Sequence, residues 1–239
     1  MIESNQNEKL KLVRKLRDRK HREREGLFAT EGEDLLEAGL AAGAEPRFVL
    51  VAAGSGLEGE EVAPELLDGV SALGSGTRAI AVWPLRWAEQ VETPTFYLHG
   101  VGDPGNVGTI VRTVDALLGG SVVLGPGCAD PFSPKAVRAS MGSIFSTPPT
   151  KGDVGATGEP RVAFVAQGGQ KLDTLAGAAT VCLGAEREGL PEKVVAACDR
   201  RLTIPLRAGG PESLNVAAAA AIAAQRISSL AMTEARPDA

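Results

Sequence analysis

Short apolar runs alternate with amphipathic stretches along the first third of the chain. Apolar runs of about four to eight residues bounded by turn residues are typical of buried strands. Such strands are predicted at 26–32 (GLFATEG), 47–53 (RFVLVAA) and 77–84 (TRAIAVWP). Helices are predicted around them at 7–25, 33–42 and 64–73. The polar, proline-containing stretch 85–94 breaks the pattern and predicts a linker.

The same alternation continues more regularly beyond the linker. Strands are predicted at 95–100, 121–125, 161–166, 179–184 and 201–206. Helices are predicted at 107–118, 134–143, 190–198 and 213–230. Short apolar strands alternating with helices predict an α/β fold with a mostly parallel sheet and helices on both faces. Ligands of such sheets bind beyond the carboxyl ends of the strands, so the loops there form the candidate site.

Composition narrows the class of protein. The 239 residues allow one large or two small domains, and no apolar stretch reaches the roughly 18 residues of a membrane span. The N-terminal segment lacks an apolar signal core, so a cytoplasmic protein is expected. Cys128, Cys182 and Cys198 lie far apart without CxxC spacing, which favours reduced, buried thiols. With only His21 and His99, neither a zinc site nor a Ser-His-Asp triad is expected.

The net charge of −5 is unevenly distributed. Residues 1–30 hold nine basic and five acidic residues, a net charge of +4, so the other 209 residues carry −9. A local basic helix can contact several RNA phosphates even in an acidic protein. The candidate contacts are Lys11, Arg14, Arg17 and Arg19. An equally favoured interpretation is a solvated helical face with Leu10, Val13 and Leu16 pointing inward.

The loop after the predicted strand 95–100 contains the sequence GNVGTIVRT at 105–113. Asn106 can cap the following helix by accepting a backbone N–H, and capping alone explains an asparagine there. Capping does not explain Arg112, which stands among apolar residues of the same helix. A site that handles an anion or a hydroxyl group does explain an arginine at this place.

Two later loops carry similar polar residues. The first is LGAEREGLP at 183–191, in which Gly184 and Gly189 allow sharp turns and Glu186 can accept hydrogen bonds. A plain strand-to-helix turn explains this loop as well. In IPLRAGGPESLNVAAAAAIAAQ (204–225), the SLN sequence precedes an alanine-rich helix and can also be a simple cap. The phosphate fingerprints GxGxxG and GK[ST] are absent.

The three sequences NxGxxxR, GxExxGLP and IPL…SLNVA occur in a fixed order after successive strands. Together with VRASMGSIFSTP at 137–148, they resemble the SpoU (TrmH) family of RNA 2'-O-ribose methyltransferases, of the SPOUT class. The resemblance covers roughly residues 94–230. More weakly, GLFATEGEDLLEAGLAAG resembles the small, ribosomal-protein-like substrate-binding domain that precedes the catalytic domain in many members. The resemblance thus implies an RNA substrate-binding domain at 1–90 and a catalytic domain at 94–239.

The resemblance further implies a C-terminal trefoil knot, a homodimer without metal, and S-adenosylmethionine as cofactor. The implied catalytic residues are Asn106, Arg112, Glu186, Ser213 and Asn215. The implied cofactor-binding residues are Leu183, Gly184, Ile204, Leu206 and Leu214. The chain departs from the family pattern in two places: the loop between Ile204 and Leu214 is one residue longer than is common, and Ala217 stands where a serine often follows LNV.

The implied reaction transfers a methyl group from a sulfonium to a ribose 2'-hydroxyl in structured RNA, with ribosomal RNA favoured. A neutral arginine at pH 7 costs on the order of 8 kcal/mol, so we expect Arg112 to stabilise the developing alkoxide as a cation and not to act as a base. Three alternatives stay open: a tRNA substrate, an inactive RNA-binding module, and a flavodoxin-like nucleotide-binding domain without an RNA role.

Overall fold

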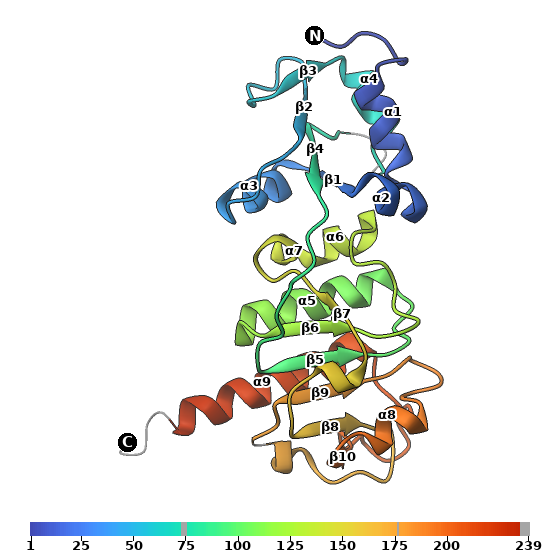
Figure 1. Cartoon of the computed structure of the whole chain (residues 1–239), viewed down its shortest axis with the longest axis vertical. Helices are drawn as coiled ribbons and strands as arrows, with labels where there is room; N and C mark the ends of the chain where they lie inside the picture. The colour runs from blue at the N-terminus through green and yellow to red at the C-terminus, as the bar shows by residue number, and fades with distance from the viewer. Residues whose placement is uncertain (73–75, 176, 235–239) are drawn as a thin grey trace. The chain divides into compact units, whose positions relative to one another are not determined.

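The computed structural model describes residues 1–72, 76–175 and 177–234, and the chain divides into two compact units (Figure 1). The first unit comprises Met1–Arg86 together with Asp130–Ser146. The second comprises Trp87–Ala129 together with Thr147–Ala239. The change of unit after Arg86 lies inside the predicted linker 85–94. The segment 130–146 belongs to the first unit, although it lies within the range 94–239 predicted for the catalytic domain. A division into two continuous domains does not describe this exchange.

The first unit is built on a four-stranded sheet with the order β1-β4-β2-β3. Its strands are β1 (Leu27–Glu31), β2 (Phe48–Ala52), β3 (Glu60–Val62) and β4 (Ala79–Pro84). β4 pairs antiparallel with β1 and β2, whereas β3 is parallel to β2. The three predicted strands are confirmed. β3 was not predicted because only Val62 of its three residues is buried, which leaves no apolar run to detect.

The helices of this unit are α1 (Glu8–Lys15), α2 (Arg19–Glu25), α3 (Glu33–Ala41), α4 (Pro64–Val70), α6 (Pro134–Ser140) and α7 (Ser143–Ser146). The prediction of one helix over 7–25 is wrong. The side chain of Asp18 accepts a hydrogen bond from Lys20 N at 2.7 Å and starts a new helix. Leu10, Val13 and Leu16 are buried, so the predicted inward face of the segment is confirmed.

The segment 130–146 is held in the first unit by aromatic packing. The ring of Phe132 lies 5.2 Å from that of Phe28, and the ring of Phe145 lies 4.8 Å from that of Trp83. Ring centroids at 4.5–7 Å in tilted or edge-on arrangements are typical of stabilising aromatic pairs. The predicted helix 134–143 is divided into α6 and α7, because Met141 adopts a left-handed conformation after α6.

Arg22 is the buried charged residue of this unit, and its side chain joins the segment 130–146 to the α1–α2 turn. Its side chain is 4% exposed and pairs with Asp130 at 2.6 Å. Nη1 also donates to the carbonyl oxygens of Leu16 at 2.7 Å and Arg17 at 2.8 Å. Arg22 is one of the nine basic residues of the N-terminal segment, but the structure gives its guanidinium an internal role and removes it from any RNA-facing surface.

We expect Arg22→Ala to lower the free energy of unfolding by about 3 kcal/mol, because it leaves the carboxylate of Asp130 without its partner. Urea denaturation followed by circular dichroism measures the change. The matched control is Arg19→Ala, which removes an exposed pair with Glu23 on the same helix and should cost less than about 1 kcal/mol. Equal losses in the two variants would contradict a special role for the buried pair.

The second unit contains a six-stranded sheet with the order β10-β8-β9-β5-β6-β7, and every adjacent pair is parallel. The strands are β5 (Thr95–Leu98), β6 (Ser121–Leu124), β7 (Thr150–Lys151), β8 (Arg161–Phe164), β9 (Thr180–Leu183) and β10 (Arg200–Leu202). The predicted parallel α/β sheet is therefore confirmed. The last strand ends at Leu202 and not at Leu206, because residues 203–215 form the loop that leads into the final helix.

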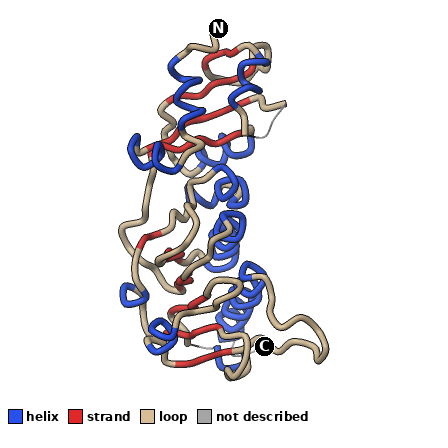
Figure 2. Tube along the Cα trace, turned by 90° about the vertical axis from the view of Figure 1, so that its right-hand side faces the viewer, coloured by secondary structure: helices blue, strands red, loops and turns tan. Residues whose placement is uncertain are grey.

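Helices cover both faces of this sheet (Figure 2). The helices are α5 (Pro104–Leu118), α8 (Glu192–Ala196) and α9 (Val216–Glu234), with short 3-10 turns η1 (Val154–Ala156) and η2 (Leu172–Leu175). Phe96 and Leu98 of β5 pack in one core with α5 and α9. Tyr97 of the same strand points to the other face, where it packs with Val154 and Val194. Among the described residues, no helix is long and apolar enough to cross a membrane.

Candidate active site

Three loops of the second unit meet beyond the carboxyl ends of neighbouring strands. β5 leads through residues 99–103 into α5, and β9 leads into the loop 184–191. β5 and β9 are adjacent in the sheet, and His99 N donates to the carbonyl oxygen of Leu183 at 2.9 Å where the two loops begin. The loop 203–215 returns from β10 to the start of α9. The three loops thus meet at the sheet edge where the candidate site was predicted.

Asn106, Glu186 and Asn215 form one hydrogen-bonded cluster at this edge. Asn106 Nδ2 donates to Glu186 Oε1 at 2.5 Å. Asn215 Nδ2 donates to Asn106 Oδ1 at 3.1 Å and to Glu186 Oε1 at 3.2 Å. Within the described part of the chain, Glu186 Oε2 has no hydrogen-bond partner, so it can accept a bond from a ligand hydroxyl. Three residues separated by up to 109 positions in the sequence therefore converge.

The helix starts explain why these side chains reach one another. The cap of α5 is Asp103, whose Oδ1 accepts from Asn106 N at 3.0 Å, so the predicted start at 107 and the capping role of Asn106 are wrong. Asn106 lies in the first turn, and its side chain is available to Glu186. Asn215 does cap α9, because its Oδ1 accepts from Ala217 N at 2.9 Å, while its Nδ2 serves the cluster. The predicted start of α9 at 213 is three residues too early.

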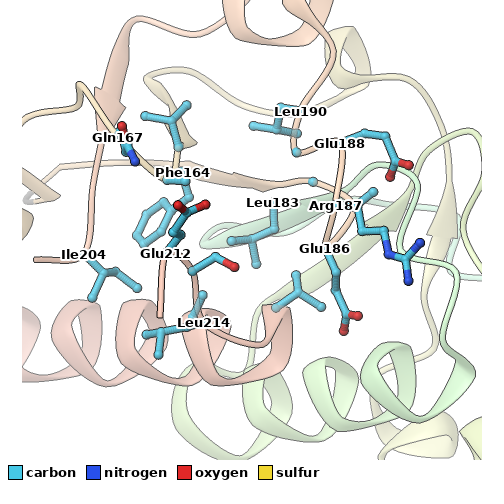
Figure 3. A pocket seen from close by; sticks show the side chains of 18 of the residues that line it. Phe164, Gln167, Leu183, Glu186, Arg187, Glu188, Leu190, Ile204, Glu212 and Leu214 are labelled. Carbon is cyan, nitrogen blue, oxygen red and sulfur yellow. The ribbon is translucent and has the colours of Figure 1, made fainter. Parts of the chain in front are cut away.

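A pocket of about 420 Å³ adjoins this cluster (Figure 3). All five residues predicted to hold a cofactor line it, namely Leu183, Gly184, Ile204, Leu206 and Leu214. Glu186 and Ser213 also line it, so the pocket and the cluster share the side chain of Glu186. A cavity of this size with apolar walls and a few convergent polar groups is typical of a small-molecule site.

Sequence reasoning missed the part of the pocket wall that comes from the end of β8. Phe164 and Gln167 line the pocket there (Figure 3), followed by the glycine turn at Gly168. The signal was present, because a strand followed by two glycines lies at the same sheet edge as the other loops. Acidic side chains at Glu188 and Glu212 complete the lining and were also not predicted.

Comparison with known proteins identifies the family. Residues 94–225 match the model of the SpoU rRNA Methylase family, and residues 7–80 match the MRM3-like substrate binding domain. The chain belongs to the SpoU rRNA methylase family. It is 30% identical to the 23S rRNA (guanosine(2553)-2'-O)-methyltransferase RlmP of Bacillus subtilis over 240 residues, which cover 92% of this chain and 96% of the relative.

Solved structures of SpoU-type proteins share the fold over nearly the whole chain. An AdoMet-bound rRNA methyltransferase from Sinorhizobium meliloti is 26% identical, with a TM-score of 0.82, and the match covers 99% of this chain and 97% of that one. A TrmH-family protein from Porphyromonas gingivalis is 35% identical, with a TM-score of 0.79, and covers 95% of this chain and 98% of its own.

Arg112, the remaining residue predicted to be catalytic, is not brought into the cluster. It is exposed on α5 and does not line the pocket. Within the described residues it has neither a hydrogen bond nor an ion pair. Its neighbours Val111 and Val114 take the buried side of the helix.

The four basic residues predicted to contact RNA all have partners inside the first unit. Lys11 pairs with Glu8 at 2.9 Å, and Arg19 pairs with Glu23 at 2.9 Å. Arg17 donates to the carbonyl oxygen of Ser71 at 2.6 Å, and Arg14 is hydrogen-bonded to Asn5. The ion pairs of Lys11 and Arg19 are exposed, so they contribute little and leave these two charges accessible to a polyanion.

In the described ranges, no three His, Cys, Asp or Glu side chains are grouped in a way that could hold an ion.

Proposed function

We propose that this SpoU-family chain transfers a methyl group from S-adenosylmethionine to a ribose 2'-hydroxyl of ribosomal RNA. The observation that carries the proposal is the position of the Asn106–Glu186–Asn215 cluster, which shares Glu186 with a pocket of cofactor size. A pocket alone would fit many ligands. A pocket joined to polar groups that can hold a hydroxyl fits a group transfer between two bound substrates.

The chemistry of the pocket lining fits S-adenosylmethionine. Leucine and isoleucine side chains of three loops offer apolar walls to a nucleoside. The acidic side chains at Glu188 and Glu212 complement a ligand that carries a positive sulfonium and an ammonium group. The related protein from S. meliloti is AdoMet-bound, and the B. subtilis relative is named as a 2'-O-methyltransferase of 23S rRNA.

When bound, S-adenosylmethionine supplies an activated methyl group that needs no metal. The residues of this chain then have three tasks. Asn106 and Asn215 fix the orientation of Glu186 through its Oε1. Glu186 Oε2 accepts the hydrogen bond of the ribose hydroxyl and aligns its oxygen for in-line attack. The guanidinium of Arg112 stabilises the negative charge that develops on that oxygen, whose proton passes to solvent late in the transfer.

The exposed position of Arg112 requires that another molecule complete the site. Bound RNA can draw the guanidinium to the reacting ribose, and a second copy of the chain can supply it in the homodimer that we propose. The proposed homodimer rests on the resemblance to the SpoU family. The trefoil knot and the cytoplasmic location belong to the same proposal.

Mapping of ribose methylation tests the proposed substrate. Ribosomal and transfer RNA from cells with and without this gene are compared by primer extension and mass spectrometry. The expected result is one 2'-O-methyl group that is missing from ribosomal RNA in the mutant cells. Loss of a methyl group from tRNA instead would favour the tRNA alternative. Unchanged RNA and no binding of S-adenosylmethionine would favour an inactive RNA-binding module.

We also propose that the N-terminal basic segment binds RNA phosphates. A quadruple variant should weaken RNA binding and flatten its dependence on salt, because each lost phosphate contact lowers the slope of log K against log [salt] by roughly 0.7 to 0.9. The substitutions are Lys11→Gln, Arg14→Gln, Arg17→Gln and Arg19→Gln. Binding to a ribosomal RNA fragment at several salt concentrations measures the slope.

The matched control removes the same number of positive charges elsewhere and should leave the slope nearly unchanged. Its substitutions are Arg47→Gln, Arg86→Gln, Lys193→Gln and Arg201→Gln. If the two variants change RNA affinity and its salt dependence equally, the basic segment is only a solvated helical face. Deletion of residues 1–90 is a poorer experiment, because it would uncover the buried aromatic side of segment 130–146.

A further inference from the structure

Two cysteines that stand 16 positions apart in the sequence are neighbours in the second unit. Cys182 is buried in β9, and Cys198 is half-buried just beyond the end of α8. Their sulfur atoms lie 3.6 Å apart, within reach of a thiol–thiol hydrogen bond, and both are free thiols. The sequence predicted isolated structural cysteines, so the pairing is a property of the fold that spacing did not reveal.

The two thiols are chemically unequal. The hydrogen bond with Cys198, together with burial, raises the pKa of the Cys182 thiol. The hydrogen bond with Cys182 lowers the pKa of the Cys198 thiol in spite of its partial burial, and the positive charge of Arg161 acts in the same direction. The third cysteine, Cys128, has its pKa raised by burial and donates to the carbonyl oxygen of Leu98 at 3.2 Å. Cys198 is thus the thiol that most readily becomes a nucleophilic thiolate.

The pair adjoins the pocket through the chain itself. Leu183 and Gly184 follow Cys182 directly and line the pocket, and so does Leu190, which precedes α8. A bond between the two sulfur atoms would close the segment 183–197 into a loop that contains the pocket-lining residues from Leu183 to Leu190. β9 is held by β5 on one side and β8 on the other, so an adjustment falls mainly on α8 and the loop 184–191.

We propose that Cys182 and Cys198 form a reversible disulfide in the presence of a peroxide, and that this bond weakens ligand binding in the adjoining pocket. The Cys198 thiolate attacks one peroxide oxygen, the O–O bond breaks, and Cys198 becomes a sulfenic acid while hydroxide leaves. The sulfur of Cys182 then attacks that of Cys198, its proton passes to the departing hydroxyl, and water is released. In total, two thiols are oxidised and one hydrogen peroxide is reduced to two waters.

The bond requires only a short movement. Disulfide sulfur atoms lie about 2.05 Å apart, so the sulfur atoms must approach from the 3.6 Å of the reduced form. Because the strand is fixed on both sides, the end of α8 moves toward it and displaces Leu190 at the pocket. Reduction by a thiol restores the open arrangement, as in other exchangeable disulfides. The effect on the pocket rests on the proposed function, whereas the disulfide itself does not.

Peptide mapping tests the disulfide directly. The reduced, folded protein is treated with a small excess of hydrogen peroxide, blocked with iodoacetamide and digested with trypsin. The expected product joins the peptides 172–187 and 194–200, is lighter than the two free peptides by two hydrogen atoms, and disappears on treatment with dithiothreitol. Cys128 should remain alkylated as a free thiol. Absence of the joined peptide, or oxidation of Cys128 at the same rate, would overturn the proposal.

Single variants assign the order of the steps. Cys198→Ala should leave Cys182 unoxidised, and Cys182→Ala should leave a Cys198 sulfenic acid that dimedone traps. Cys128→Ala is the matched control and should form the disulfide at the normal rate. Trapping on Cys182 in place of Cys198 would contradict the assignment of the nucleophile.

Calorimetry with S-adenosylmethionine tests the consequence in the full chain. Oxidised protein should bind the cofactor severalfold more weakly than reduced protein, and dithiothreitol should restore the affinity. The Cys198→Ala variant should bind equally before and after peroxide. Equal affinity of the two wild-type forms would overturn the coupling to the pocket. If neither form binds S-adenosylmethionine, the proposed function is contradicted. The disulfide is then tested by the peptide map alone.

Discussion

Arg112→Ala is expected to lower the rate of methyl transfer by roughly a thousandfold and to leave the affinity for S-adenosylmethionine unchanged. Removal of one preorganised group that stabilises developing charge typically costs a factor of about a hundred to a thousand. The affinity should not change, because Arg112 is exposed on α5 and does not line the pocket. Single-turnover methylation of a ribosomal RNA fragment measures the rate, and calorimetry measures cofactor binding.

Two further variants separate the possible roles of this arginine. Arg112→Lys keeps the positive charge but loses the planar fork, so a purely electrostatic role predicts partial activity. Arg201→Ala removes an exposed arginine on the edge strand and should change neither quantity. A parallel fall of rate and cofactor affinity in Arg112→Ala would show that the arginine belongs to the cofactor site. A pH–rate profile that loses a basic limb in Arg112→Lys would favour general base catalysis.

The sheet of the second unit was predictable because its strands are short apolar runs between turn residues. Phe96 and Tyr97 of β5 are buried on opposite faces, which is why the run carries no alternation of polar residues. Weaker strands escaped prediction. β7 comprises two residues, of which Lys151 is exposed, and nothing in such a sequence distinguishes it from a loop.

Two helix starts were predicted wrongly, because several polar residues near each start can serve as the cap. Asn106 and Asp103 are both good caps, and Asp103 starts the helix because it precedes Pro104, which suits the first turn of a helix. The choice between them decides what the side-chain oxygen of Asn106 binds: as a cap it would accept a backbone N–H, whereas here it accepts from Asn215 Nδ2. Asp18 similarly divides the basic segment into two helices that periodicity alone joins.

Features that depend on long-range packing could not be predicted. In the segment 130–146, Phe132 packs against Phe28 and Phe145 packs against Trp83. Both partners lie far earlier in the sequence, so no local pattern links them. The neighbouring thiols of the second unit and the buried Arg22–Asp130 pair arise in the same way. The position of the candidate site could be predicted only because its three loops follow strands of one parallel sheet. The catalytic roles of its residues remain predictions.

Gly184→Val is expected to lower the affinity for S-adenosylmethionine by more than roughly a hundredfold, since a displaced loop loses most of its contacts with the ligand. The reason is steric. A Cβ atom at Gly184 would lie 2.1 Å from the carbonyl carbon of Gly189 and 2.3 Å from Leu190 N, so backbone atoms of the loop 184–191 must move. The glycine was expected here for its backbone freedom, but what the position requires is the close approach of two backbone segments.

The control for this variant is Gly155→Val in the same unit, where a Cβ meets no atom within 4 Å. It should bind the cofactor normally, and thermal unfolding of both variants shows whether the second unit remains folded. If Gly184→Val does not fold, Leu206→Ala tests the same pocket, because this side chain is 37% exposed and its loss leaves the core intact. It should weaken binding by roughly tenfold, about the effect of losing one apolar contact of this size. Normal affinity in folded Gly184→Val and in Leu206→Ala would mean that the cofactor binds elsewhere.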